Sequence, residues 1–182
     1  MSRVEVLTLA GRADNSVRGL VPGYFALVMA TGIVSVAMHD AGQKTLSASL
    51  LLIAISAYLV LITLNLTRAW RHRDAMAEDF GDPARAFGFF TFVAATCVLG
   101  SRLGVEQYHR VAFVLLTVAA VTWLVLGYVV PWTAALGKTR RPVLQTANGS
   151  WFIWVVASQS IAVLAATLEV ELVGYRRELA LL

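Results

Sequence analysis

The polar side chains inside the long apolar stretches of this sequence are mainly hydroxyl groups at helical spacing. In the first stretch, Thr31 and Ser35 share one helical face beside Gly32. The third and fifth stretches carry four further candidates of the same kind, namely Thr91, Thr96, Ser150 and Ser158. Such hydroxyls, together with the partial positive charge at helix N-termini, can line a path for a weakly bound anion that must also leave. Packing between helices is the alternative role, because small residues and hydroxyls also allow close helix–helix contact.

The groups that other kinds of chemistry need are missing from these stretches. No Asp, Glu, Lys or Arg lies inside them, which argues against a proton relay or a voltage sensor. The single cysteine, Cys97, cannot form an internal disulfide or a cysteine pair for a metal. His39, His72 and His109 lie at the ends of stretches or between them, so they do not provide facing haem ligands. The sequence therefore predicts no enzyme activity, no cofactor and no metal site.

The amino-acid composition is unusually apolar. Hydrophobic residues make up 58% of the chain and charged residues 14%, whereas ordinary soluble domains contain about 45–50% and about 25%. So few polar side chains could not cover a water-soluble surface. The basic residues behind the net charge of +4 are clustered between apolar stretches, so nucleic acid is not an expected partner. The predicted class is an all-α integral membrane protein, with the lipid bilayer as its solvent.

The apolar stretches have the length that membrane helices need, since a bilayer core about 30 Å thick is crossed by about 20 helical residues. Transmembrane helices are predicted at about 19–38, 45–67, 83–102, 111–132 and 149–168, between a first segment 1–18 and a tail 169–182. Asp82 and Pro83 supply a start signal for the third helix. Arg85 and Arg102 are expected to extend from the ends of this helix to the two membrane interfaces.

The orientation of the chain follows from its basic residues. Ten of the 15 lie before the first helix, after the second or after the fourth, and five lie on the other side. Because cytoplasmic loops carry an excess of Lys and Arg, the N-terminus is predicted to be cytoplasmic.

The prolines indicate an internal repeat. Pro22, Pro83 and Pro142 each precede an odd-numbered helix, at spacings of 61 and 59 residues. A period of this length corresponds to two membrane crossings and their loops, which predicts a helical-hairpin repeat. Chance placement of three prolines at helix starts is the alternative.

Three stretches resemble the tellurite-resistance/dicarboxylate transporter family, which includes malate permeases, sulfite efflux proteins and slow-type anion channels. The first is Pro-Gly-Tyr-Phe at 22–25 with Val-Met-Ala-Thr-Gly-Ile-Val-Ser at 28–35. The second runs from Asp82-Pro83 through Phe-Phe-Thr-Phe-Val-Ala at 89–94. The third, and the most specific, is Gly-Ser-Trp-Phe-Ile-Trp-Val-Val-Ala-Ser-Gln-Ser at 149–160.

The resemblance implies a ten-helix fold of five hairpins in a ring, in which odd helices line a central pore and even helices lie outside. It also implies a homo-oligomer, commonly a trimer. The five helices predicted here correspond to the N-terminal half of that plan, so we expect a truncated form.

The function predicted from these observations is a permease or channel for C4-dicarboxylates such as malate, or for sulfite or halide, in the cytoplasmic membrane of a bacterium. The pore-lining candidates are Thr31, Gly32, Ser35, Thr91, Thr96, Ser150 and Ser158. A non-transporting membrane subunit or assembly partner is the alternative.

Overall fold

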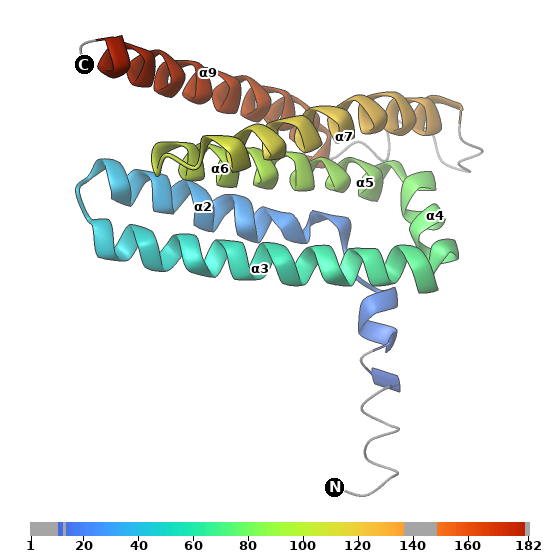
Figure 1. The fold of residues 1–182 in the computed structure, drawn as a ribbon. Coiled ribbons are helices and arrows are strands. Elements are labelled where there is room, and N and C mark those ends of the chain that lie inside the picture. Colours follow the sequence, from blue (N-terminus) through green and yellow to red (C-terminus); the bar gives the residue numbers. More distant parts are fainter. Residues whose placement is uncertain (1–10, 13, 137–148, 181–182) are drawn as a thin grey trace, which may run out of the picture.

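The computed structural model describes residues 11–12, 14–136 and 149–180, and in this part of the chain the secondary structure is helical (Figure 1). Its five candidate membrane spans are Pro22–Asp40, Lys44–Arg71, Phe87–Val105, His109–Thr133 and Gly149–Val170. The prediction of an all-α membrane fold with five apolar helices is therefore confirmed.

The first hairpin consists of α2 (Phe25–Asp40) and α3 (Lys44–Arg71), which pack along most of their length. The 3-10 turn η1 (Pro22–Tyr24) leads into α2. Gly42 lies in the tight connection with φ of 78°, a left-handed conformation that glycine adopts without steric cost. The chain can therefore reverse direction within a few residues.

The second hairpin is preceded by two short helices that the sequence did not predict as separate elements. These are α4 (Arg73–Gly81) and α5 (Pro83–Ala86), and the 3-10 turn η2 (Phe87–Phe89) joins them to α6 (Phe90–Val105). The third membrane helix thus begins in three pieces rather than as one helix from residue 83. Close packing favours glycine at position 88, because a Cβ there would lie 3.1 Å from the backbone nitrogen of Gly23.

The helices α7 (His109–Leu136) and α9 (Ile153–Ala180) complete the bundle, and η3 (Gly149–Phe152) leads into α9. Backbone helix in α9 continues to Ala180, through most of the range 169–182 assigned to a tail. Pro131 lies inside α7, near its end.

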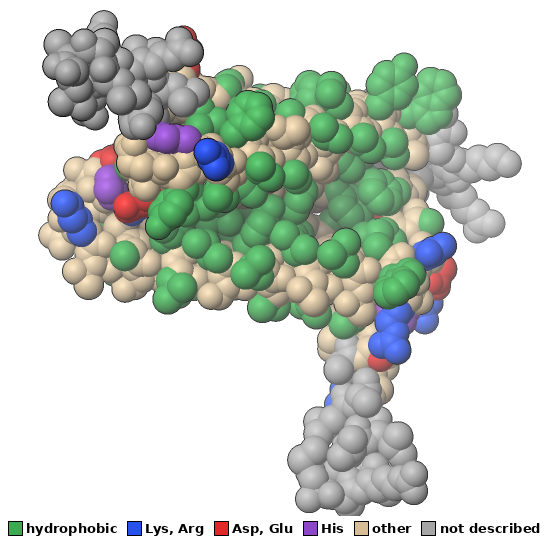
Figure 2. Space-filling view, in the orientation of Figure 1, with side chains coloured by type: hydrophobic (Ala, Val, Ile, Leu, Met, Phe, Trp, Pro, Cys, Tyr) green, Lys and Arg blue, Asp and Glu red, His purple; other side chains and the backbone are tan. Residues whose placement is uncertain are grey.

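Helix α6 lies at the centre of the bundle, with α2, α7 and α9 packed around it (Figure 1). In the most apolar stretch of each candidate span, 67% of the residues are buried for the span that contains α6, whereas at most 28% are buried for any other span. Hydrophobic side chains cover the middle of the surface, whereas charged side chains gather near its ends (Figure 2). This distribution suits a bundle that has lipid around its middle and water at both ends.

Candidate functional site

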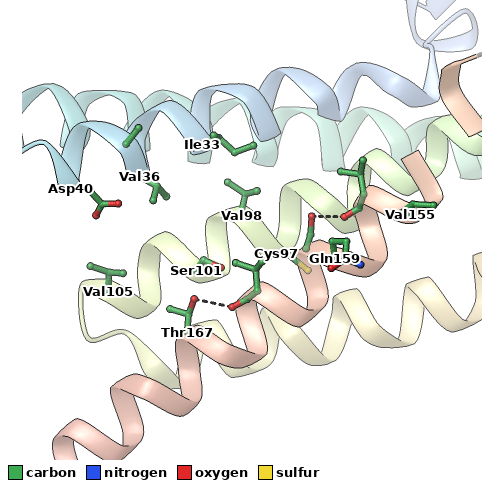
Figure 3. A pocket seen from close by; sticks show the side chains of 14 residues that line it. Ile33, Val36, Asp40, Cys97, Val98, Ser101, Val105, Val155, Gln159 and Thr167 are labelled. Atoms are coloured by element: carbon green, nitrogen blue, oxygen red, sulfur yellow. Dashed lines mark hydrogen bonds between the residues drawn. The ribbon is translucent and has the colours of Figure 1, made fainter. Parts of the chain in front are cut away.

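A groove of about 580 Å³ lies between α2, α6 and α9, which are the first, third and fifth membrane helices (Figure 3). The α2 wall consists of Ile33, Val36, Ala37 and Asp40, and the α6 wall of Cys97, Val98, Ser101 and Val105. The α9 wall consists of Val155, Val156, Gln159, Ser160, Val163 and Thr167. Most of this lining is apolar, so a few polar side chains supply its hydrogen-bonding groups.

Two of the polar side chains in the groove are satisfied by their own helix. The Ser160 hydroxyl donates to the Val156 carbonyl at 2.8 Å, and the Thr167 hydroxyl donates to the Val163 carbonyl at 2.9 Å. Because these bonds already use the hydroxyl protons, both side chains are poor donors for anything in the groove.

Two other polar side chains in the groove are unpaired. Within the described residues, neither the Gln159 amide nor the Ser101 hydroxyl has a hydrogen-bond partner. Gln159 is exposed and lies at the middle of the span Gly149–Val170, and Ser101 faces the same groove from α6 (Figure 3). A polar group without a partner is costly inside a bilayer. The groove therefore offers hydrogen-bonding capacity at a depth where lipid supplies none.

One end of the groove carries a negative charge. Asp40 is the last residue of α2, it is exposed, and it is the one charged residue among the 14 that line the groove. Its carboxylate disfavours anions at this end through like-charge repulsion, and salt in the surrounding water screens that repulsion.

The seven residues predicted to line a pore do not line this groove. The clearest case is Ser35, which is buried against α3. Its hydroxyl donates to the Ser47 carbonyl at 2.8 Å, and the Ser47 hydroxyl donates in return to the Ser35 carbonyl at 2.7 Å. This reciprocal pair joins α2 to α3.

The neighbours of Ser35 on α2 have different surroundings. The Thr31 hydroxyl donates to the Leu27 carbonyl of its own helix at 2.8 Å. Gly32 is buried against α6, and a Cβ added there would lie 2.6 Å from Cγ1 of Val98. Gly32 thus sets how closely α2 approaches α6.

The two threonines of α6 are buried and bonded. Thr91 donates to the Gly88 carbonyl at 2.7 Å and lies 3.2 Å from the Pro22 carbonyl. The Thr96 hydroxyl lies 2.7 Å from the Tyr58 hydroxyl on α3 and 2.7 Å from the Phe92 carbonyl. Thr91 therefore joins the start of α6 to η1, and Thr96 joins α6 to α3.

The two serines near the start of α9 lie away from the groove wall. Ser158 accepts a hydrogen bond from Nε1 of Trp123 at 3.0 Å and donates to the Trp154 carbonyl at 2.9 Å. Ser150 is half-buried in η3. For all seven positions, a role along an anion path stays a prediction.

Sequence reasoning missed the residues that do face the groove. Gln159 directly follows Ser158, but a step of one residue turns the side chain by about 100° around a helix. The available signal was the position of this amide in the middle of an apolar span, because polar groups at that depth are usually functional.

Comparison with known families was decisive for identity. The profile of the voltage-dependent anion channel family matches residues 19–179. This chain belongs to that family. The resemblance predicted from residues 22–35, 82–94 and 149–160 is thereby confirmed. No curated protein and no solved structure gives a significant match.

Membership of the anion-channel family makes this chain a multi-pass membrane protein of a transport class, with small anions as the kind of substrate. Among the described residues, no group of three or more His, Cys, Asp or Glu side chains could hold a metal ion.

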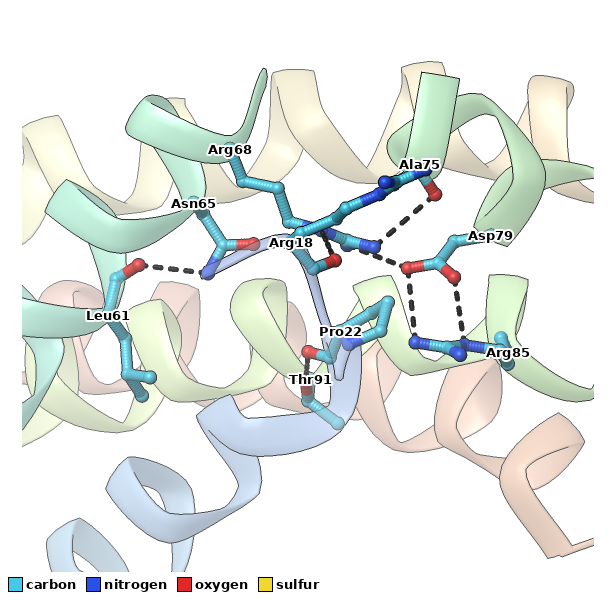
Figure 4. Close-up of polar contacts among 9 residues, drawn as sticks. All are labelled: Arg18, Pro22, Leu61, Asn65, Arg68, Ala75, Asp79, Arg85 and Thr91. Carbon is cyan, nitrogen blue, oxygen red and sulfur yellow. Dashed lines mark hydrogen bonds and ion pairs between the residues drawn. The ribbon is translucent and has the colours of Figure 1, made fainter. Parts of the chain in front are cut away.

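A buried charge cluster holds one end of this anion-channel bundle together (Figure 4). Asp79 on α4 lies 2.7 Å from Nη1 of Arg68 and 2.8 Å from Nε of Arg85. Arg68 also donates to the backbone carbonyls of Arg18 and Ala75. The cluster therefore ties the N-terminal segment, α3, α4 and α5 to one another.

A second buried arginine lies at the opposite end of α6. Arg102 has 2% of its side chain exposed; it donates to the Ser47 hydroxyl at 3.0 Å and to Glu106 at 2.8 Å. The expectation that Arg102 extends to the membrane interface is wrong, because Ser47 and Glu106 hold its guanidinium inside the protein. Arg85, 40% exposed, likewise turns toward Asp79.

Proposed function

We propose that α2, α6 and α9 form the wall of a transmembrane path for small anions, and that the groove between them is part of this path. The observation that carries the proposal is the pair of unpaired polar side chains, Ser101 and Gln159, in a groove at membrane depth. Water or a polar solute in the groove would satisfy both groups, whereas lipid tails would satisfy neither.

An anion is the favoured solute because the family is one of anion channels and the available groups can donate hydrogen bonds to an anion without carrying a fixed charge. The amide N–H groups of Gln159 and the hydroxyl of Ser101 can donate to a carboxylate or another oxyanion. Among the described residues, no Lys or Arg lines the groove. Binding by neutral donors is weak, and weak binding suits a path that an ion must leave.

C4-dicarboxylates such as malate are the substrates that we propose first, with sulfite and halides next. The family supports small anions as a class, and the resemblance to malate permeases favours the dicarboxylates. We further propose a bacterial cytoplasmic membrane, a cytoplasmic N-terminus and a homotrimer. We keep the prediction that Thr31, Gly32, Ser35, Thr91, Thr96, Ser150 and Ser158 contribute to the anion path. Four of these side chains, Ser35, Thr91, Thr96 and Ser158, also hydrogen-bond to neighbouring elements of the bundle.

A second candidate is a membrane subunit that carries no flux and pairs with other transmembrane helices. The exposed Gln159 amide favours this candidate too, because a hydrogen bond to a partner helix would also satisfy it. In the ten-helix plan five inner helices close the pore, whereas three line the groove, which also favours a partner that supplies further helices.

Flux measurements separate these candidates. The purified chain is reconstituted into vesicles, and malate, sulfite and chloride gradients are applied in turn, with protein-free vesicles as the control. Saturable flux of any of these anions supports the path. If the anions slow labelling of a cysteine in the groove but no flux is seen, the chain is the non-transporting subunit.

A further inference from the structure

We infer that Gln159 selects oxyanions over halides in the groove, an inference that rests on the function proposed above. The supporting observations are the position of this side chain, its exposure and its lack of a partner among the described residues. Gln159 projects from α9 into the groove, where Cys97 and Ser101 lie on the facing α6 wall (Figure 3).

The chemistry of an amide supplies the selectivity. Its NH2 group donates two hydrogen bonds and its carbonyl oxygen accepts. A hydroxy acid or a partly protonated oxyanion presents both a negative oxygen and an O–H group, so it can satisfy both halves of the amide at once. Chloride offers an acceptor only and leaves the carbonyl oxygen unpaired. A site built to hydrogen-bond its substrate discriminates strongly against an analogue that lacks the matching group.

The surroundings of Gln159 strengthen this preference. Val155, Val156 and Val163 line the same wall and offer no hydrogen-bonding side chains. The hydroxyls of Ser160 and Thr167 are already bonded to their own helix. On α9, therefore, the Gln159 amide is the side chain that can contact an anion at the middle of the span.

The experiment uses the full chain in vesicles, with Cys97→Ala and Val156→Cys as the background. Val156 lines the groove one helical turn from Gln159. A negatively charged methanethiosulfonate labels the introduced cysteine, and the concentrations of malate and of chloride that halve the labelling rate are measured. We expect malate to protect the cysteine from labelling at a concentration about tenfold lower than chloride, as the one additional hydrogen bond from its hydroxyl to the amide carbonyl would provide.

The decisive variant is Gln159→Met, which keeps the length of the side chain but removes both amide functions. It also removes an unpaired polar group from the membrane interior, so it should not impair folding. Gln43→Met is the matched control, because Gln43 is an exposed residue between α2 and α3, outside the groove. We expect the malate preference to disappear in Gln159→Met and to persist in Gln43→Met.

The possible results separate this inference from the proposed function. If malate and chloride both protect, and Gln159→Met keeps the same preference, the selectivity role is overturned while the path remains. If neither anion protects the background chain, the anion path is overturned and the role of Gln159 with it.

Discussion

The two sides of α6 differ in how their polar groups are satisfied. Toward α3, Thr96 meets the hydroxyl of Tyr58 at 2.7 Å, and Arg102 donates to the hydroxyl of Ser47. Toward the groove, Ser101 has no hydrogen-bond partner within the described residues, and Gln159 on the α9 wall has none either. One side of the helix uses its polar groups to hold the bundle together, and the other side leaves them available.

This difference shows why hydroxyl spacing alone does not locate a path through a membrane protein. Polar groups that hold helices together are as regularly spaced as those that line a pore. What separates the two roles is whether each group already has a partner.

The largest effect is expected from Asp79→Ala. Asp79 is 4% exposed and pairs with Arg68, which is 1% exposed, so the substitution leaves a buried arginine without its carboxylate. Loss of one partner of a buried pair costs about 3–5 kcal/mol. Thermal unfolding in detergent should show a large fall in stability.

The matched control is Arg18→Ala, which removes the exposed pair with Asp74 but keeps the backbone carbonyl that Arg68 uses. An exposed pair is worth about 0–1 kcal/mol. Similar losses in the two variants would show that the Asp79 cluster does not hold this end of the bundle.

A smaller loss is expected from Gly32→Leu. The added side chain meets Val98 at the contact between α2 and α6, and overpacking of this kind costs about 1–3 kcal/mol. Leu52→Ala, at a position that is 67% exposed, should change stability by about 0.5 kcal/mol or less. Equal unfolding temperatures for the two variants would contradict close packing of α2 on α6.

Tyr58→Phe tests the bonded side of α6 by removing one hydroxyl. The variant loses the 2.7 Å contact with Thr96, and such bonds between membrane helices average about 0.6 kcal/mol and reach about 1.7 kcal/mol. Tyr128→Phe, at an exposed position of α7, serves as the control. A destabilisation no greater than that of the control would mean that the Thr96 contact adds nothing to helix packing.

The smallest effect is expected from Asp40→Asn, which removes the negative charge at the end of the groove. At low ionic strength, the substitution should make an anionic reagent label Val156→Cys faster. The increase in labelling rate should become small near physiological salt, where the screening length is about 8 Å. A neutral reagent should react at an unchanged rate. Glu78→Gln on α4, outside the groove, is the control, and an equal acceleration there would show a general charge effect.

The sequence predicted the membrane helices well because each is apolar over a length that a bilayer requires. It did not predict α4, since Arg73–Gly81 is a short polar helix without an apolar stretch. The pairing of Arg68 with Asp79 was also missed, because it joins two different helices and no local pattern reports such a contact.

The groove residues were missed for a related reason. A membrane helix is apolar on nearly every side, so periodicity does not reveal which face meets lipid, another helix or a cavity. Ser35 and Thr96 were therefore predicted to line a pore, and that role stays a prediction. The structure adds that partners on α3 bind both hydroxyls. The three-dimensional arrangement shows that Gln159, and not the adjacent Ser158, lines the groove.

The most direct test of the account is whether water and anions reach the middle of the groove in a membrane. Single cysteines are introduced at Gln159, in the groove, and at Val121, an exposed residue near the middle of α7, both in a Cys97→Ala background. Their labelling by an anionic, membrane-impermeant methanethiosulfonate is then compared in intact vesicles. The account predicts rapid labelling by the anionic reagent at position 159 and almost none at position 121. Equally slow labelling at both positions would mean that lipid or protein fills the groove, and would contradict an anion path between α2, α6 and α9.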